Sequence, residues 1–213
     1  MLSAAFIAVA MIVARPPAAA TQPRELPAQL VTMSGRVELS RRSAPNWTAA
    51  TLRDELSFGD GARTVAGRAA LLTKSGQALR VGPRTQIFFA TGEPPGDVTR
   101  VRMDGGRLWV AVLPNGPAVE VRAGPATVTT RAGGAGITMN PDGSVIVSVY
   151  HGAASVTGDG WQRALGQDQE VVVLAGVPPK EIVSVKRERR DPEWIKWNEQ
   201  QDQAGGYGAR VQK

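Results

Sequence analysis

The stretch that decides the fold is Val98-Thr-Arg-Val-Arg-Met-Asp-Gly-Gly-Arg-Leu-Trp-Val-Ala-Val112, in the middle of the chain. Period-two apolar spacing on either side of Asp104-Gly105 is typical of β-strands with one buried face. An Asp-Gly pair supplies the positive φ angles of a tight hairpin turn. The stretch therefore predicts two short antiparallel strands, 98–103 and 107–112, joined by a hairpin at Asp104-Gly105.

The same alternation, broken by glycine turns, continues from Leu30 to Val185. Further strands are expected at 35–39, 78–81, 86–89, 119–122, 127–130, 136–139, 145–149, 154–156, 170–174 and 182–185. Further hairpin turns are expected at Asn115-Gly116, Asp142-Gly143 and Asp159-Gly160, and Gly133-Gly134-Ala-Gly136 is expected to join two strands. The prediction is an all-β fold of many short antiparallel strands, in a sandwich, jelly roll or β-helical roll, with a short C-terminal helix.

The residue inventory excludes several kinds of chemistry. The chain of 213 residues has no cysteine and a single histidine, His151. Disulfides, thiolate metal sites, iron–sulfur clusters and cysteine nucleophiles are therefore ruled out. A Ser-His-Asp arrangement would need a nucleophile beside His151, and the sequence has no Gly-x-Ser-x-Gly elbow. We expect no enzyme activity, no cofactor and no metal, with His151 as a structural or surface residue.

The formal net charge of +6 comes from arginines that are spread along the chain, mostly one at a time. A nucleic-acid-binding protein usually gathers its basic residues on one element, with aromatic residues between them. We therefore expect a basic, solvated surface and no nucleic-acid partner. Such a surface also suits contact with anionic lipid head groups or acidic protein partners.

The first twenty residues are predicted to direct export. Leu2–Ala14 is uncharged and apolar, and Ala18-Ala19-Ala20 suits signal cleavage. As a helix, Leu2–Ala14 would rise roughly 20 Å, less than the ~30 Å of a bilayer core. No positive residue precedes the apolar run, so residues 1–20 are either a signal peptide or a retained apolar anchor. Residues 21–29 are predicted to be an extended linker.

The C-terminal part changes character at the basic run 186–190. Asp191-Pro192-Glu193 is a typical helix start, and Gly205-Gly206 ends the helix. Trp194, Ile195 and Trp197 lie near one face of that helix. Two interpretations stay open: the face packs on the preceding sheet, or it binds a partner protein, since tryptophans often anchor interfaces. Residues 205–213 are expected to form a flexible tail.

A tight turn is predicted at Gly59-Asp60-Gly61. Its carboxylate can accept backbone N–H bonds, while Arg63 and Arg68 could bridge to it or to neighbouring carbonyls. We interpret Gly59, Asp60, Arg63 and Thr64 as residues that hold the fold, with no ligand of their own.

An ordered set of segments resembles a FecR-like domain. The set consists of Leu56-Ser-Phe-Gly-Asp-Gly-Ala-Arg-Thr64, Gly67-Arg-Ala-Ala-Leu-Leu72, Leu79-Arg-Val-Gly-Pro-Arg-Thr85, Val101–Val112, Val119–Val156 and Leu165-Gly-Gln167. The resemblance covers roughly residues 33–175 and implies an exported β-domain, predicted here over 30–185. Its best-known members are inner-membrane signal relays with a cytoplasmic sigma-factor-binding segment. Only fourteen apolar residues precede the linker here, so we expect the β-domain without that segment.

The expected function is therefore protein–protein contact. We expect a periplasmic module, peripheral to the membrane or anchored in it, that serves as a structural or accessory subunit of an integral membrane complex. A signalling relay, as the resemblance implies, is the alternative from another class. A glycan-binding module is a third reading, which the 5% aromatic content does not favour.

Overall fold

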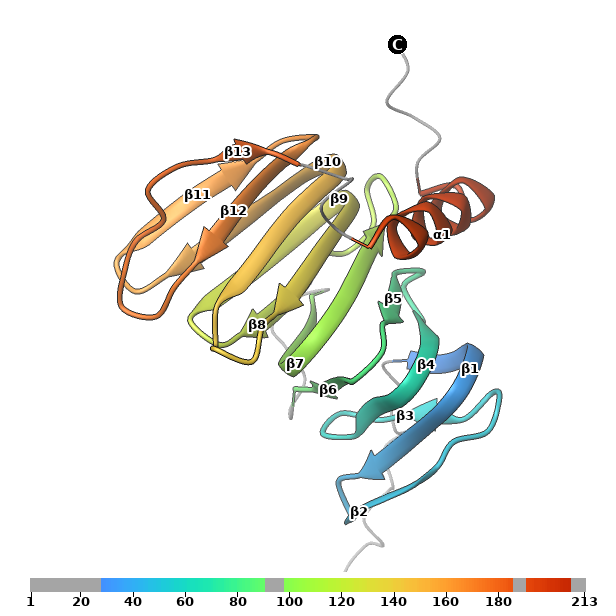
Figure 1. Cartoon of the computed structure of the whole chain (residues 1–213). Helices are drawn as coiled ribbons and strands as arrows, with labels where there is room; N and C mark the ends of the chain where they lie inside the picture. Colours follow the sequence, from blue (N-terminus) through green and yellow to red (C-terminus); the bar gives the residue numbers. More distant parts are fainter. Residues whose placement is uncertain (1–27, 91–97, 186–190, 208–213) are drawn as a thin grey trace, which may run out of the picture.

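The computed structural model describes residues 28–90, 98–185 and 191–207, and confirms the all-β prediction. Strands dominate these residues, and the one helix follows the last strand (Figure 1). The elements are β1 (Ala28–Arg41), β2 (Ala44–Ala49), β3 (Glu55–Leu56), β4 (Gly61–Thr73), β5 (Ala78–Val81), β6 (Thr85–Phe89), β7 (Thr99–Val112), β8 (Val119–Ala123), β9 (Ala126–Met139), β10 (Val145–Gly158), β11 (Trp161–Leu165), β12 (Gln169–Val173), β13 (Val183–Ser184) and α1 (Pro192–Ala204).

Five strands are long enough to belong to two layers. β1, β4, β7, β9 and β10 have 13 or 14 residues each, and their two halves pair with different neighbours. In β7 the first half, Thr99–Met103, pairs with β8, while the second half, Gly106–Val112, pairs with β9. A single sheet is therefore folded over on itself along a line that crosses the long strands.

The pairings give the strand order of each layer within the described residues. The first layer runs β2-β1-β4-β6-β7-β8-β9-β10-β11. The second layer runs β3-β1-β4-β5-β7-β9-β10-β12-β13. β7 and β8 run parallel, and the other pairs are antiparallel. The chain thus progresses from β1–β4 at one end of the fold to β11–β13 at the other (Figure 1).

Pairs of glycines stand where the long strands change layer. Gly35 is the register partner of Gly67 between β1 and β4, and Gly133 is the partner of Gly152 between β9 and β10. All four have positive φ, from +70° to +105°. A Cβ on Gly67 would lie 1.9 Å from the carbonyl oxygen of Ser34, so only glycine fits. Register shifts beside both pairs add the local twist that turns the sheet.

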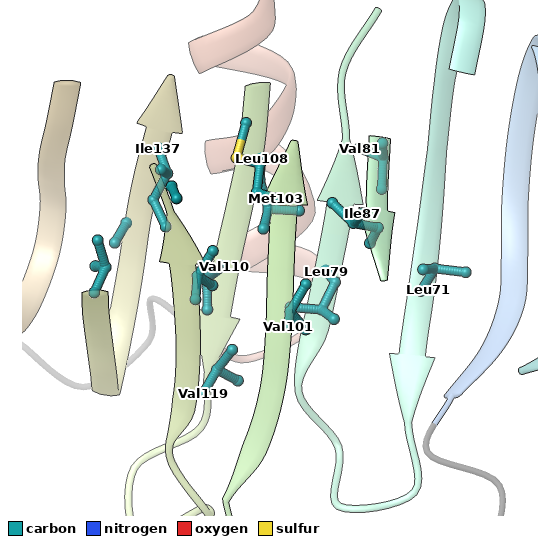
Figure 2. Packing of buried hydrophobic residues seen from close by; sticks show 14 of the residues in the cluster. Leu71, Leu79, Val81, Ile87, Val101, Met103, Leu108, Val110, Val119 and Ile137 are labelled. Carbon is teal, nitrogen blue, oxygen red and sulfur yellow. The ribbon is translucent and has the colours of Figure 1, made fainter. Parts of the chain in front are cut away.

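The core fills the space between the two layers. It takes apolar residues from both halves of the long strands, and Figure 2 shows side chains of β4 to β9 meeting there. Leu71, Leu79 and Leu108 come from the second layer, and Ile87 and Val101 come from the first. Each such side chain, fully removed from water, contributes roughly 1.5–3 kcal/mol of transfer free energy.

The predicted hairpin at Asp104-Gly105 was wrong, because these residues lie inside β7. The segment 133–136 likewise lies inside β9 instead of joining two strands. In this fold, glycine at positive φ bends a strand where the strand passes from one layer to the other. In a hairpin, glycine at positive φ would instead reverse the direction of the chain. The turn at Asn115-Gly116 also joins parallel strands, β7 and β8, so it is no hairpin. Asp142-Gly143 and Asp159-Gly160 do form hairpins, as predicted.

The ends of the chain are described only in part. β1 begins at Ala28, two residues before the predicted start of the β-domain at Leu30. The predicted signal peptide or anchor, residues 21–27 of the predicted linker, the basic run 186–190 and residues 208–213 of the tail lie outside the described residues. Within the described residues, no helix has the length and hydropathy needed to cross a bilayer.

The corner geometry predicts the cost of a methyl group at Gly67. Gly67→Ala forces an alanine into positive φ and into the Ser34 carbonyl, whereas Gly143→Ala meets positive φ alone, with nothing within 4 Å. We expect Gly143→Ala to lose about 1–2 kcal/mol and Gly67→Ala clearly more, or to fail to fold. Urea unfolding of both variants measures this, and equal losses would contradict the tight corner.

Candidate functional site

Helix α1 begins as the sequence predicts. The Asp191 carboxylate caps it by accepting from the backbone N–H of Trp194 at 3.1 Å, and Pro192 opens the first turn. Arg107 on β7 donates to the same carboxylate at 2.8 Å. Burial raises the pKa of the Asp191 carboxyl, but the Trp194 N–H and the Arg107 guanidinium outweigh it and hold that pKa below its ordinary value. The cap thus also fastens the helix start to the sheet.

The helix lies on the outer face of the second layer, where a second apolar cluster forms. Trp194 and Ile195 are buried there with Trp109 and Tyr150, whose rings stack at 4.5 Å. The cluster also contains Ala78, Ala111 and Tyr207. Alanines on β5 and β7 leave room for the helix to approach, so the small side chains of this face suit a covering helix.

A buried carboxylate joins the helix to three strands. Asp202 is 1% exposed, and it accepts from Arg80 on β5 at 2.5 Å and from the indole Nε1 of Trp109 on β7 at 2.9 Å. The imidazole Nε2 of His151 on β10 lies 2.8 Å from the same carboxylate. We call Asp202, Arg80, Trp109 and His151 the clasp. A buried carboxylate that is paired and hydrogen-bonded in this way fixes one position of the helix.

Two glycines of β9 make space for this arrangement. A Cβ on Gly134 would lie 2.3 Å from Nε2 of His151 and 2.8 Å from the Asp202 carboxylate. A Cβ on Gly136 would lie 3.0 Å from the Tyr150 ring. The glycine-rich part of β9 therefore makes room for the helix contact. The other ring nitrogen of His151, Nδ1, is buried and has no hydrogen-bond partner among the described residues.

Sequence reasoning missed the clasp, although a signal for it existed. Trp194, Asn198 and Asp202 are spaced four apart, so they share one face of α1, and all three are buried. An acidic residue at such a buried position needs a cationic partner. Nothing in the sequence says which of the many arginines it is, because Arg80 lies 122 residues away.

The predicted partner-binding residues are used differently by the fold. Trp194 and Ile195 pack on the sheet, which is the first of the two interpretations given above. Trp197 is half-buried, stacks on Trp194 at 5.5 Å and lies under the guanidinium of Arg68 at 4.4 Å. Partner binding by Trp194, Ile195 and Trp197 stays a prediction. Of these three residues, Trp197 is the one at the edge of the contact between α1 and the sheet.

The predicted turn residues hold the first layer together. The Asp60 carboxylate, 2% exposed, accepts from the backbone N–H of Ser57 and of Arg42, each at 2.9 Å. Its cationic partner is Arg41 at 3.1 Å. A bridge from Arg63 or Arg68 to this carboxylate was one of the two alternatives predicted for those arginines, and the structure does not place either of them there. Gly59, with φ of +87°, donates its N–H to the carbonyl of Phe89 at 3.0 Å. Asp60 thereby ties β1 to the β3–β4 turn.

Arg63 and Thr64 have other partners. Arg63 donates to Glu38 on β1 at 2.5 Å and lies 4.5 Å from the centre of the Trp47 ring. The Arg63 guanidinium, followed by that of Arg36, holds the pKa of the Glu38 carboxyl below its ordinary value. The Thr64 hydroxyl donates to the carbonyl of Gly82 and accepts from the N–H of Thr85 at 3.2 Å. These contacts link β4 to the corner between β5 and β6.

Large exposed apolar side chains gather at the two ends of the sheet. At the far end, β12, β13 and the segment between them expose Val172, Leu174, Val177, Ile182 and Val183. At the near end, β1, β4 and the segment before β3 expose Val31, Met33, Leu52, Val65 and Leu72. We call these groups the far patch and the near patch. No group of three or more His, Cys, Asp or Glu among the described residues is placed to hold a metal ion.

Comparisons with known proteins give a partial likeness. No protein-family model matches the chain, and no curated protein matches it. Two crystal structures from Parabacteroides distasonis ATCC 8503, at 2.50 and 1.65 Å resolution, are each described as "a putative anti-sigma factor". They are 20% and 19% identical to this chain, both with a TM-score of 0.48. The match covers 58% of this chain and 57% of the length of each, and at this level it carries no functional argument.

The clasp predicts that removal of the negative charge of Asp202 strongly lowers the free energy of unfolding. Asp202→Asn leaves Arg80 buried without its counter-ion, and we expect it to lose about 3–5 kcal/mol or to detach α1. Glu193→Gln removes one acidic charge from an exposed position of the same helix and should lose about 1 kcal/mol or less. Tryptophan fluorescence during urea unfolding, with hydrogen exchange of α1, measures both. Equal behaviour of the two variants would refute the clasp.

Proposed function

We propose that the chain is a non-enzymatic β-module that contacts protein partners at both ends of its folded sheet, as an accessory subunit of a membrane-associated complex on the periplasmic side. One observation carries the proposal: among the described residues, the exposed large apolar side chains belong to the strands and adjoining segments at the two opposite ends of the sheet (Figure 1). Contiguous exposed apolar surface is typical of interaction sites, whereas scattered apolar residues are ordinary. Two separate patches suit a subunit that joins two neighbours.

The far patch has the shape of a docking site for side chains. Val172, Leu174, Val177 and Val183 line a hollow of about 390 Å³ together with Pro178 and Pro179. Prolines have no N–H to offer a pairing strand, so they protect this sheet edge from strand addition. A partner is therefore expected to place apolar side chains in the hollow and to leave the edge unextended.

The near patch lies on paired strands. Leu72 on β4 is the register partner of Gln29 on β1, and it shares the outer face of the second layer with Ala78. Val31 lies at a register shift of β1, and Met33 is the register partner of Ala69, so Met33 lies on the opposite face of the strand pair. Val31, Met33 and Leu72 are each more than a third exposed, so no element among the described residues covers them. Helix α1 covers the middle of the second layer and reaches Arg68 on β4 through Trp197. A partner protein would extend that cover over the rest of β4 and over β1.

The geometry around the one histidine supports a non-catalytic role. His151 and Asp202 lie 2.8 Å apart, as a general base and its orienting carboxylate do in hydrolases. Here the Asp202 carboxylate also accepts hydrogen bonds from Arg80 and Trp109 beneath α1. Nδ1, the second imidazole nitrogen of His151, has no hydroxyl partner among the described residues. The described residues therefore place no nucleophile, the third member of such a site, beside His151.

A signalling relay is the second candidate, and the clasp favours it. Helix α1 is held on the sheet through one carboxylate with three donors, so a partner that competes for the helix would also uncover the Trp109 and Tyr150 rings. A relay would release α1 when a partner binds, whereas an accessory subunit would keep α1 docked. Hydrogen exchange of α1 in the free and assembled protein separates the two.

Charge substitutions in the patches test the accessory-subunit proposal. Leu174→Glu in the far patch and Leu72→Glu in the near patch each put a carboxylate where a partner would bury a leucine. Both positions are exposed, at 51% and 40%, so the fold should lose less than about 1 kcal/mol. Each variant is expected to lower the amount of partner that co-purifies in gentle detergent by about tenfold or more.

Gln200→Glu on the exposed side of α1 is the matched control and should retain the partners. Retention of all partners by both patch variants, with intact folding, would contradict the proposal. Loss from only one variant would reduce the contact to one end of the sheet.

A further inference from the structure

The outer face of the first layer carries an unusual pair of like charges. Arg102 on β7 is the register partner of Arg122 on the parallel strand β8, and both are exposed. Like charges directly opposite one another on neighbouring strands are unfavourable. Arg100, two residues before Arg102 on β7, brings a third guanidinium to the same face.

The arginines differ in how they are neutralised. Arg102 pairs with Asp104 at 2.9 Å, and Arg100 pairs with Glu120 at 3.2 Å. Arg122 has no acidic partner among the described residues. Exposed ion pairs contribute little and are exchanged readily for other anions. Among the described residues, the Arg122 guanidinium is thus an unpaired donor group beside two weakly paired ones.

These side chains border a hollow of about 490 Å³. Arg100, Arg102, Arg122, Glu120 and Phe88 line it, so three cations face one anion. Guanidinium groups bind carboxylates through two parallel N–H bonds, and a cluster of them favours an acidic ligand. The hollow is open, which suits a chain segment better than an enclosed small molecule.

The neighbouring aromatic rings argue against a glycan. The Arg102 guanidinium lies over the Phe88 ring, 4.6 Å from its centre. The centres of the Phe88 and Trp47 rings are 5.7 Å apart. Arg63 covers Trp47 in turn, at 4.5 Å. A sugar ring stacks on a bare aromatic face, and here guanidinium groups occupy those faces. The rings instead brace the arginines in fixed positions, which lowers the entropy lost when an anion binds.

We propose that this hollow, lined by Arg100, Arg102 and Arg122, binds an acidic segment of a partner protein in extended conformation. Arg100 and Arg102 project from the same face of β7 and lie two residues apart, a repeat of roughly 6.6 Å. Alternate side chains of an extended segment share that repeat, so carboxylates at positions i and i+2 meet the two arginines. Arg122 stands one strand to the side, at roughly 4.8 Å, and can bind either carboxylate. This contact is ionic and independent of the two apolar patches.

Fluorescence anisotropy with the full chain tests the proposal. The probe is a labelled short peptide of alternating glutamate and threonine, and its counterpart has glutamine in place of glutamate. Vesicles of anionic phosphatidylglycerol form a separate arm. Arg122→Glu reverses the unpaired charge, and Lys74→Glu, in the exposed turn between β4 and β5, makes the same change in net charge on the other layer.

The expected result is binding of the glutamate peptide, no binding of the glutamine peptide, and weakening by about tenfold or more in Arg122→Glu. Lys74→Glu should retain the parent affinity within about twofold, because Lys74 is not among the residues that line the hollow. Equal weakening by both variants would show attraction to net charge alone and overturn the site. Binding to the vesicles without binding to the peptide would also overturn it, in favour of a lipid surface.

Discussion

The structure depends on a close approach of two backbones at the corner of the sheet. Where Gly35 meets Gly67, and Gly133 meets Gly152, neighbouring strands come so near that a single carbon atom would collide with a carbonyl oxygen. This contact lets the long strands cross from one layer to the other without a break in pairing. One continuous sheet thereby encloses one core, and its two outer faces can carry different surfaces.

The two outer faces of the sheet differ in what covers them. The second layer is covered in its middle by α1, and the clasp around Asp202 reaches β5, β7 and β10 at once. A helix of 13 residues would be marginal alone, so its stability comes from this contact. The first layer has no helix over it among the described residues and carries arginines braced by aromatic rings. The exposed apolar side chains lie at the two ends of the sheet, beyond which the described residues contain no further strand.

Period-two alternation was enough to predict the β class, and the Asp191-Pro192 pair was enough to place the start of the helix. The hairpin at Asp104-Gly105 was wrong because a bend and a reversal both need glycine at positive φ, and local sequence does not separate them. The Asp60 turn accepted backbone N–H groups as its Asx chemistry requires, yet its cationic partner was Arg41. Partners such as Arg80 and Asp202 meet only through the tertiary fold, since no local pattern links residues that distant.

We propose that this module works as a fixed part of a larger protein assembly at the membrane. The most direct test is native mass measurement of the unmodified chain after gentle detergent extraction of the membranes in which it is made. The account predicts a stoichiometric assembly of this chain with other proteins, and the mass of the chain within it reports whether residues 1–20 are retained. A free, monomeric chain in the soluble envelope fraction, with no partner at any extraction condition, would contradict the account.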